Sequence, residues 1–338
     1  MAVVKSDAYG HGAASTAELF QAAGADYLGV ASIDEGTQLR AAGNKLPILI
    51  LSPTPAWAID SALENDLDIT ITTPKQLEDV VQVAKRLDRA ARIHLKVDTG
   101  MHRLGIAPEK TASVLDEIVL EPALKLVSIY SHLAKAGDQE AVHYQRKVFE
   151  EVRLTASKMK GIFYHLASSE ATRHFADTHY DMVRVGLYLF GLEPNAVSTD
   201  LKPALSVRAR INHIGEIEQG QSVGYSWTWT APRPTRLASI PIGYGDGVDR
   251  SLSNNLIAHT SGKTIKQVGR ISMDQMLFDI TDVPEAQEGD VVTLIGEDEG
   301  HPSINLSQWA NSLDTITYEL ACRMRARLPR VYTRSRAR

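Results

Sequence analysis

The sequence lacks several features that would place a protein in a particular class. A single cysteine, Cys322, occurs among its 338 residues, so no disulfide can form within the chain and a reducing compartment is expected. No apolar run approaches the roughly 20 residues of a membrane helix, and the N-terminus has no signal-peptide pattern. A formal net charge of -5 argues against non-specific binding to nucleic acid. We therefore expect a soluble, cytoplasmic protein with no membrane or nucleic-acid partner.

The composition is that of an ordinary globular protein, with 43% hydrophobic and 23% charged residues. From Ala2 to about Gly186, short apolar runs alternate with helical patterns such as Leu77, Val80 and Ala84. The eight runs are Ala2–Val4, Tyr27–Ala31, Pro47–Leu51, Ile69–Ile71, Arg92–Val97, Leu126–Tyr130, Phe163–Leu166 and Val183–Val185. Eight strands alternating with helices favour an α/β fold of the (β/α)₈ barrel type, with an open doubly wound sheet as the alternative.

The pattern changes after Leu192. Pro194 and Pro203 flank a polar linker, and apolar residues then alternate with period two over residues 205–211. Further strand candidates, separated by Gly and Asp or Asn turns, are Leu237–Ile242, Asn255–His259, Ile265–Val268, Met276–Ile280 and Val291–Ile295. One short helix is expected around Trp309.

These patterns divide the chain into two domains, for which its length is sufficient. We expect a barrel over residues 1–203 and a mainly-β domain over residues 204–338. The arginine-rich tail from Arg323 to Arg338 is interpreted as a solvated surface.

In a barrel of this kind, catalytic residues lie at the C-terminal ends of the strands. Lys5 follows the first apolar run, and burial among apolar neighbours favours loss of its proton. Lys5 is therefore a candidate for a Schiff base with a carbonyl cofactor. The polar residues at the other strand ends are Lys96, Asp98, His132, Ser168, Ser169 and Arg184. Their recurrence at strand ends favours a single active site over a set of unrelated surface residues.

Seven segments resemble motifs of the alanine racemases, which are pyridoxal-phosphate enzymes with a barrel and a C-terminal β-domain. The segments are VVKSDAYGHG at 3–12, HLKVDTGMHRLG at 94–105, YSHLA at 130–134, DMVRVGLYLFGL at 181–192, SVGYSW at 222–227, IPIGYGDGVDR at 240–250 and GRISMDQ at 269–275. They follow the order of the family and span nearly the whole chain. The resemblance implies an isomerase that interconverts L-alanine and D-alanine, with cell-wall synthesis as the use of D-alanine.

The resemblance also implies a two-base mechanism in a homodimer with composite active sites. Lys5 would hold pyridoxal 5′-phosphate as an internal aldimine and, once freed by substrate, act as one acid–base group. Tyr225 would be the second base, contributed by the other subunit on the opposite face of the substrate. A free tyrosine has a pKa near 10, so the matching residues His132 and Arg184 would be needed to help it ionise.

Other matching positions imply contacts with the cofactor. Arg184 would face the pyridine nitrogen and, because arginine keeps its proton, would leave that nitrogen largely unprotonated, which suits a racemase. In a barrel the phosphate is expected at the loops after the seventh and eighth strands. The residues that match the phosphate site of the family are Tyr9, Ser169, Gly186 and Leu187, with His165 and Ser168 beside them.

A third group of matching positions implies contacts with the substrate. Arg103 would bind the ring oxygen of the cofactor and the substrate carboxylate through its planar guanidinium. Lys96 would carry a carbamate that steadies this arginine. The backbone of Met273 and the side chain of Asp274 would lie near the substrate carboxylate, and Tyr244 would lie at the entrance.

The sequence departs from the family pattern in two places. Ala326 replaces a tyrosine that narrows the substrate gate in many relatives, so a serine or broad-specificity racemase is the alternative. About one strand and one helix precede the lysine strand in relatives, which predicts either a misplaced start or an exposed barrel edge with lower stability and activity. A barrel-type decarboxylase is disfavoured by Arg184. A non-catalytic cofactor-binding module would not need Tyr225 or a second domain.

Overall fold

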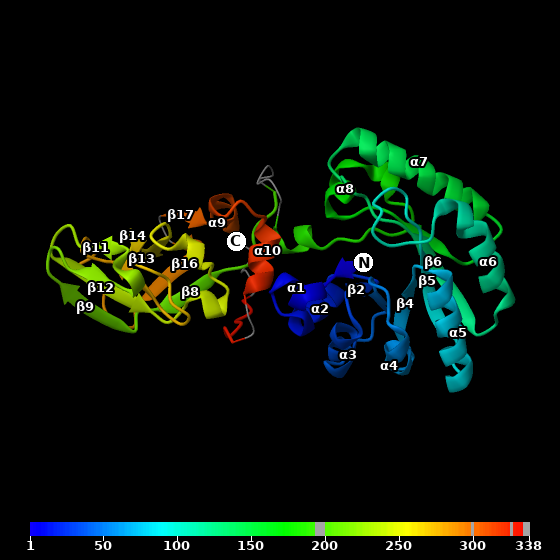
Figure 1. Ribbon diagram of the computed structural model, residues 1–338, viewed down its shortest axis with the longest axis horizontal. Coiled ribbons are helices and arrows are strands. Elements are labelled where there is room, and N and C mark those ends of the chain that lie inside the picture. The colour runs from blue at the N-terminus through cyan, green and yellow to red at the C-terminus, as the bar shows by residue number, and fades with distance from the viewer. Residues whose placement is uncertain (193–199, 299–300, 325–326, 334–338) are drawn as a thin grey trace. The chain divides into compact units, whose positions relative to one another are not determined.

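The structure, a computed structural model, describes residues 1–192, 200–298, 301–324 and 327–333. It comprises two compact units, Met1–Leu189 and Phe190–Arg338, each with its own sheet (Figure 1).

The first unit is built on a parallel sheet whose strands are ordered from β1 to β7 as in the chain. The strands are Ala2–Val3 (β1), Leu28–Val30 (β2), Ile48–Ile50 (β3), Leu67–Ile71 (β4), Ala91–Lys96 (β5), Leu124–Tyr130 (β6) and Phe163–His165 (β7). Val185 closes the sheet by forming a parallel bridge with Ala2, while the amide of Arg184 donates to the carbonyl of Ala167 at 3.0 Å. The predicted (β/α)₈ barrel is therefore confirmed, with its eighth strand reduced to a single bridge.

The exposed barrel edge that the short N-terminus predicts is not found. Strand β1 pairs with β2 on one side and with Val185 on the other. The N-terminal ammonium of Met1 donates to the carbonyl of Val183 at 2.8 Å, which ties the start of β1 to the same closing segment.

Helices cover the outer face of these strands (Figure 1). They are Ala13–Ala22 (α2), Ile33–Ala41 (α3), Ile59–Glu64 (α4), Pro74–Leu87 (α5), Thr111–Leu120 (α6), Gln139–Thr155 (α7) and Ser169–His174 (α8). In α5 the apolar positions Leu77, Val80 and Ala84 are buried on one face, as their spacing predicts. This helix begins where the hydroxyl of Thr73 accepts the amide of Gln76, with a proline at the first position.

Part of the barrel interior is apolar. Met1, Val3, Tyr27, Leu49 and Tyr130 form one buried cluster, although they come from strands on different sides of the sheet or from residues next to them. Side chains from strands that are not neighbours can meet only inside the barrel, so this cluster is the apolar part of its core.

A second, adjoining part of the interior is polar. Along β5 the alternating residues Arg92, His94 and Lys96 are polar, whereas Ile93 and Leu95 between them are fully buried. His94 and Lys96 contact side chains of β6, and Arg92 contacts Asp68 of β4. Side chains of β5 therefore alternate between two faces, and here the apolar ones face the helices while the polar ones face the barrel axis.

The second unit has an antiparallel sheet in the order β17-β16-β13-β14-β15-β12-β9, with β8 paired to β16 and a separate β10-β11 hairpin. Its strands are Val207–Arg210 (β8), His213–Ile217 (β9), Ser222–Val223 (β10), Trp229–Thr230 (β11), Thr235–Ile240 (β12), Ile257–Thr260 (β13), Lys263–Val268 (β14), Met276–Asp279 (β15), Val291–Asp298 (β16) and His301–Ile304 (β17). Two helices follow, Leu306–Ser312 (α9) and Thr317–Arg323 (α10). The mainly-β character predicted for this half is confirmed.

The arginine-rich tail is expected to be a solvated surface, and the side chain of Arg323, which is 39% exposed, forms two ion pairs there. Arg323 donates to the carboxylates of Asp249 at 2.6 Å and Glu319 at 2.7 Å. These ion pairs require the fold of α10 and of the turn at Asp249, which the composition of the tail does not reveal.

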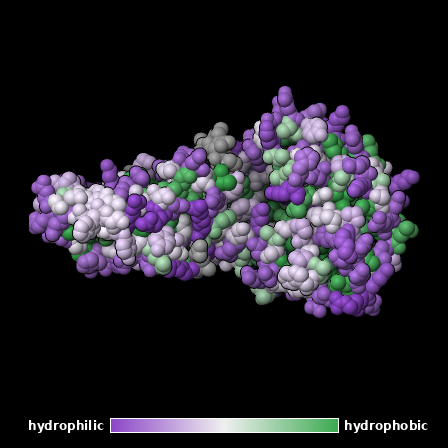
Figure 2. Space-filling model, viewed as in Figure 1, coloured by the Kyte–Doolittle hydropathy of each residue, from purple (hydrophilic) through white to green (hydrophobic). Residues whose placement is uncertain are grey.

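The surface drawn in Figure 2 is mainly hydrophilic on both units, with small separate hydrophobic areas. Among the described residues, no helix combines the length and apolar character that crossing a membrane requires.

Candidate functional site

Lys5 lies two residues after the end of β1 and begins an unusual turn. The segment Lys5–Tyr9, labelled α1 in Figure 1, is a left-handed turn in which Ser6, Asp7, Ala8 and Tyr9 have φ of 52° to 55°. Each non-glycine residue in this conformation costs roughly 1–2 kcal/mol. Such strain persists only where the surrounding structure imposes it, and it occurs mainly at functional sites.

The carboxylate of Glu35, on α3, helps to hold this turn. It accepts the amide of Ser6 at 2.6 Å and the amide of Ala31, just after β2, at 2.7 Å. On the far side of the turn, Asp7 accepts the amide of Ala13 at 2.7 Å and thereby links it to α2. The backbone after Lys5 is therefore fixed from two helices.

Positive charge is concentrated around His132. Burial lowers the pKa of Lys96 to about 7, and the neighbouring cations Arg184 and Arg103 lower it further than Asp98 raises it. The pKa of His132 lies well below its ordinary value, first because of burial and then because of Arg184, Lys96, Arg103 and Lys5. This end of the barrel therefore favours an anionic ligand and keeps His132 neutral.

Arg184 is the most enclosed of these cations. Its guanidinium donates to Nδ1 of His165 at 2.8 Å, to Nδ1 of His132 at 3.2 Å and to the carbonyl of Ser131 at 2.6 Å. The rings of Tyr130 and His165 are stacked with centroids 4.6 Å apart, and the guanidinium carbon lies 5.2 Å from the centroid of Tyr130. Burial lowers the pKa of Arg184 to about 10, so it remains charged at neutral pH.

Three of the four predicted phosphate-site residues lie against one another. The amide of Gly186 donates to the hydroxyl of Ser169 at 3.0 Å. A Cβ at Gly186 would lie 2.5 Å from the hydroxyl oxygen of Tyr9, so only glycine leaves this space open. Leu187 follows directly in the chain. Two hydroxyls and a glycine amide beside a group of cations fit a phosphate monoester.

The remaining predicted residues lie on the second unit. Tyr225 follows β10 in a tight turn with Ser226 and Trp227 at φ of 59° and 45°, and its side chain is 69% exposed. A Cβ at Gly224 would approach the amide nitrogen of Arg270 to 3.3 Å, so the motif that carries Tyr225 packs on the motif at 269–275.

Met273 and Asp274 belong to a loop held by Arg327. The guanidinium donates to Asp274 at 2.8 Å, to the carbonyl of Met273 at 3.3 Å and to Asp246 at 2.6 Å. Asp246 lies in the turn that begins at Tyr244, whose amide donates to the carbonyl of Ser272 at 3.0 Å. Arg327 therefore joins the two predicted substrate loops. This residue was missed from the sequence because only the neighbouring Ala326 was considered there, and Ala326 lies outside the described residues.

The structure also includes polar residues in the barrel interior that sequence reasoning missed, namely Asp68, Arg92, His94 and Ser128. A signal was present, because Arg92 and His94 alternate with Lys96 along one strand and must share its face. Among the described residues, Arg184 and Asp181 form no salt bridge, so Asp181 does not give Arg184 a structural role through such a pair. Asp181 instead accepts the amide of Tyr164 at 2.8 Å.

Comparisons with known proteins identify the same family for both halves of the chain. A family model for the N-terminal domain of alanine racemases matches residues 1–194, and one for their C-terminal domain matches residues 204–332. An alanine racemase of Nostoc sp. (strain PCC 7120) is 42% identical, with 98% of this chain and 88% of the relative covered. One from Synechocystis sp. (strain PCC 6803) is 40% identical over 98% of this chain and 91% of its own length.

Solved structures agree with these relatives. The alanine racemase of Clostridium difficile 630 superposes with a TM-score of 0.92 at 32% identity, covering 96% of this chain and 86% of that one. The enzyme from D-cycloserine-producing Streptomyces lavendulae gives a TM-score of 0.90 at 34% identity, covering 99% and 90%.

Proposed function

Because the chain belongs to the alanine racemase family, we propose that it interconverts L-alanine and D-alanine with pyridoxal 5′-phosphate as cofactor, as a homodimer. One observation carries the proposal. At the mouth of the barrel, Lys5 and Arg184 both act electrostatically on His132, and Arg184 donates to two histidines that burial and charge keep neutral.

The residues of the first unit fit the cofactor. Tyr9, Ser169, Gly186 and Leu187 would hold its phosphate, the amine of Lys5 its aldehyde carbon, and Arg184 its pyridine nitrogen. Bound in this way, pyridoxal phosphate makes the α-hydrogen of an amino acid acidic. Because Arg184 is a donor that keeps its proton, it leaves the ring a weaker electron sink than an acidic residue would. Prompt return of the proton is then favoured over transamination or decarboxylation.

Racemisation needs one proton carrier on each face of the substrate. The amine of Lys5 is one, and the phenol of Tyr225 from a second copy of the chain is the other. His132 accepts from Arg184 at Nδ1, so its ring proton is on Nε2, where it can donate to a phenolate and stabilise it. Arg103 and the backbone of Met273 would hold the substrate carboxylate.

Lys96 completes the proposal as a site of carbamate formation. An amine with a pKa of about 7 is largely unprotonated in mildly alkaline solution, as reaction with carbon dioxide requires. The product is an anion between Arg103 and Arg184, which would replace three mutually repelling cations by an alternating arrangement. Electron density that ends at a bare amine in crystals grown with bicarbonate would refute this assignment.

Serine is the competing substrate because Ala326 replaces the gate tyrosine. We expect weaker preference for alanine over serine than in relatives with tyrosine, measured as the ratio of kcat/KM values. If Ala326→Tyr leaves that ratio unchanged, the gate does not set specificity.

The proposed function is tested by absorbance and circular dichroism. Purified protein with pyridoxal phosphate should show a near-ultraviolet to violet band that borohydride abolishes, and L-alanine should lose its optical signal. Lys5→Ala should remove both. Tyr225→Ala should keep the band and slow turnover of one enantiomer more than the other. A chain that binds the cofactor but racemises neither alanine nor serine contradicts the proposal.

A further inference from the structure

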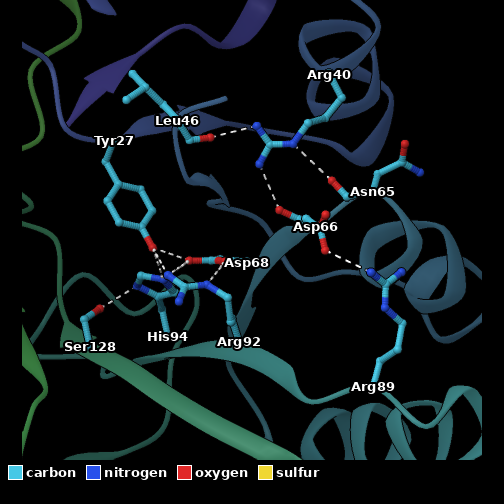
Figure 3. A network of polar contacts seen from close by, with 10 residues as sticks. All are labelled: Tyr27, Arg40, Leu46, Asn65, Asp66, Asp68, Arg89, Arg92, His94 and Ser128. Carbon is cyan, nitrogen blue, oxygen red and sulfur yellow. Dashed lines mark hydrogen bonds and ion pairs between the residues drawn. The ribbon is translucent and has the colours of Figure 1, made fainter. Parts of the chain in front are cut away.

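The hydrogen bonds of Arg184 continue into the interior of the barrel. Beyond His165, the Nε2 atom of that ring lies 2.9 Å from the hydroxyl of Ser128. The same hydroxyl lies 2.6 Å from Nδ1 of His94, whose Nε2 lies 3.0 Å from the carboxylate of Asp68. The last part of this path, from Ser128 to Asp68, is drawn in Figure 3. Five side chains from five different strands or strand ends thus form one buried chain, which we call the relay.

The direction of every hydrogen bond in the relay follows from its two ends. A guanidinium only donates, so Nδ1 of His165 accepts and the ring proton is on Nε2. That proton points at Ser128, whose own hydroxyl proton then goes to Nδ1 of His94. The remaining proton of His94 is on Nε2 and is received by the carboxylate of Asp68. No link can be reversed without placing two donors or two acceptors face to face.

The two histidines are held neutral by their surroundings. Burial lowers the pKa of His165 well below its ordinary value, and Arg184 adds to this effect. Burial also lowers the pKa of His94, although Asp68 acts in the opposite sense. Both rings are fully buried, so water does not compete for their nitrogen atoms.

The far end of the relay is anchored as an anion. Burial alone would raise the pKa of Asp68, but donors from His94, Arg92 and Tyr27 outweigh it and lower the pKa. Arg92 reaches the carboxylate with Nε at 2.7 Å and with its terminal nitrogen at 3.0 Å. Tyr27 donates to the same carboxylate, and all these contacts lie close together in Figure 3. Asp68 is thus a fixed acceptor.

We propose that Ser128, His94 and Asp68 are positioning residues for racemisation, because the relay fixes the tautomer of His165 that lets it accept from Arg184. A neutral imidazole in water exchanges its proton between both nitrogens. Without an acceptor on the Nε2 side, His165 could carry its proton on Nδ1, facing the guanidinium donor and displacing it. The relay therefore holds Arg184 where the proposed function requires a hydrogen-bond donor. The expected change in kcat rests on that proposed function, whereas the expected tautomer of His165 does not.

The test compares Ser128→Ala with wild type in the full-length protein, first by nitrogen-15 NMR of the imidazoles. Wild type should show His165 and His94 protonated at Nε2. In Ser128→Ala, His165 should show a measurable Nδ1-protonated population. Ser128→Cys, which is similar in size and a weaker hydrogen-bonding group, should give a smaller change. Thr111→Val removes a buried hydroxyl on α6 outside the relay and should leave both signals as in wild type.

The second readout is kinetic. Loss of one neutral hydrogen bond, worth about tenfold at most, should lower kcat of Ser128→Ala by roughly three- to tenfold and raise transamination per turnover, with KM nearly unchanged. The NMR result does not depend on catalysis, so it stands if the chain proves not to racemise alanine. The inference is overturned if wild-type His165 carries its proton on Nδ1 or on both nitrogens. It is equally overturned if the tautomer changes in Ser128→Ala while kcat and transamination do not.

Discussion

At the scale of single residues, the site is governed by unbalanced charge. The amine of Lys96 lies 4.8 Å from the centroid of the Tyr130 ring and the guanidinium of Arg184 lies 5.2 Å from it, so two cations lie against one aromatic ring. Asp98, the acidic group that opposes them, has its carboxylate directed to the amides of Gly100 and Met101. The electrostatic cost of this arrangement should be visible in how stability depends on pH.

Lys96 should make the protein more stable as the pH rises. Its pKa is lowered from 10.5 to about 7 in the folded state, so between these values the unfolded chain binds more protons. Unfolding free energy therefore increases with pH over this window, by at most about 1.4 kcal/mol per pH unit. Urea denaturation in buffers free of carbon dioxide should show this slope in wild type and not in Lys96→Met. Parallel curves for the two proteins would contradict the lowered pKa.

Gly186 and Tyr9 should act as a coupled pair in cofactor binding. Gly186→Ala places a Cβ 2.5 Å from the Tyr9 hydroxyl and should weaken pyridoxal phosphate binding at least about tenfold. Tyr9→Phe removes the obstructing oxygen, so the double variant should lose less than the two single variants combined. Absorbance titration with the cofactor measures the binding affinity of the two single variants and of the double variant. Strictly additive losses would show that the two residues do not share the site.

At the scale of elements, the left-handed turn is the feature that the sequence did not predict. Ser6, Ala8 and Tyr9 are not residues that favour positive φ, so the local pattern is that of a turn but does not predict its left-handed backbone. It is imposed by contacts with α2 and α3 that exist only after folding. The strand ends, by contrast, were predicted well, because apolar runs and the barrel rule need only periodicity. Arg92 and His94 were missed because polar residues of a strand were not assigned to the interior.

Glu35→Ala should loosen the turn that follows Lys5. The substitution leaves the amides of Ser6 and Ala31 without their carboxylate partner, at a cost of about 1–2 kcal/mol. Asp34→Ala removes the same charge from the same turn of α3 and is the matched control. Urea denaturation should show a lower unfolding free energy for Glu35→Ala than for Asp34→Ala, and cofactor titration should show weaker binding by Glu35→Ala. Equal effects would mean that Glu35 acts only through the helix dipole.

At the scale of the whole molecule, the proposed chemistry needs groups from both units of the chain. The first unit carries Lys5 and the residues fitted to the cofactor, while the second carries Tyr225 on an exposed turn. Because the side chain of Tyr225 is exposed, it is accessible to a second copy of the chain, as a residue that completes the neighbouring copy's active site must be. The proposed two-base mechanism therefore requires a dimer.

The most direct measurement is subunit complementation between Lys5→Ala and Tyr225→Ala. Each variant alone should be nearly inactive as a racemase. Mixed by co-refolding, half of the dimers formed at random contain both chains, and each such dimer has one complete site of two. Activity should therefore return to roughly a quarter of the wild-type value. If heterodimers are detected by mass and activity does not return, Lys5 and Tyr225 do not act together across subunits, and the two-base account is wrong.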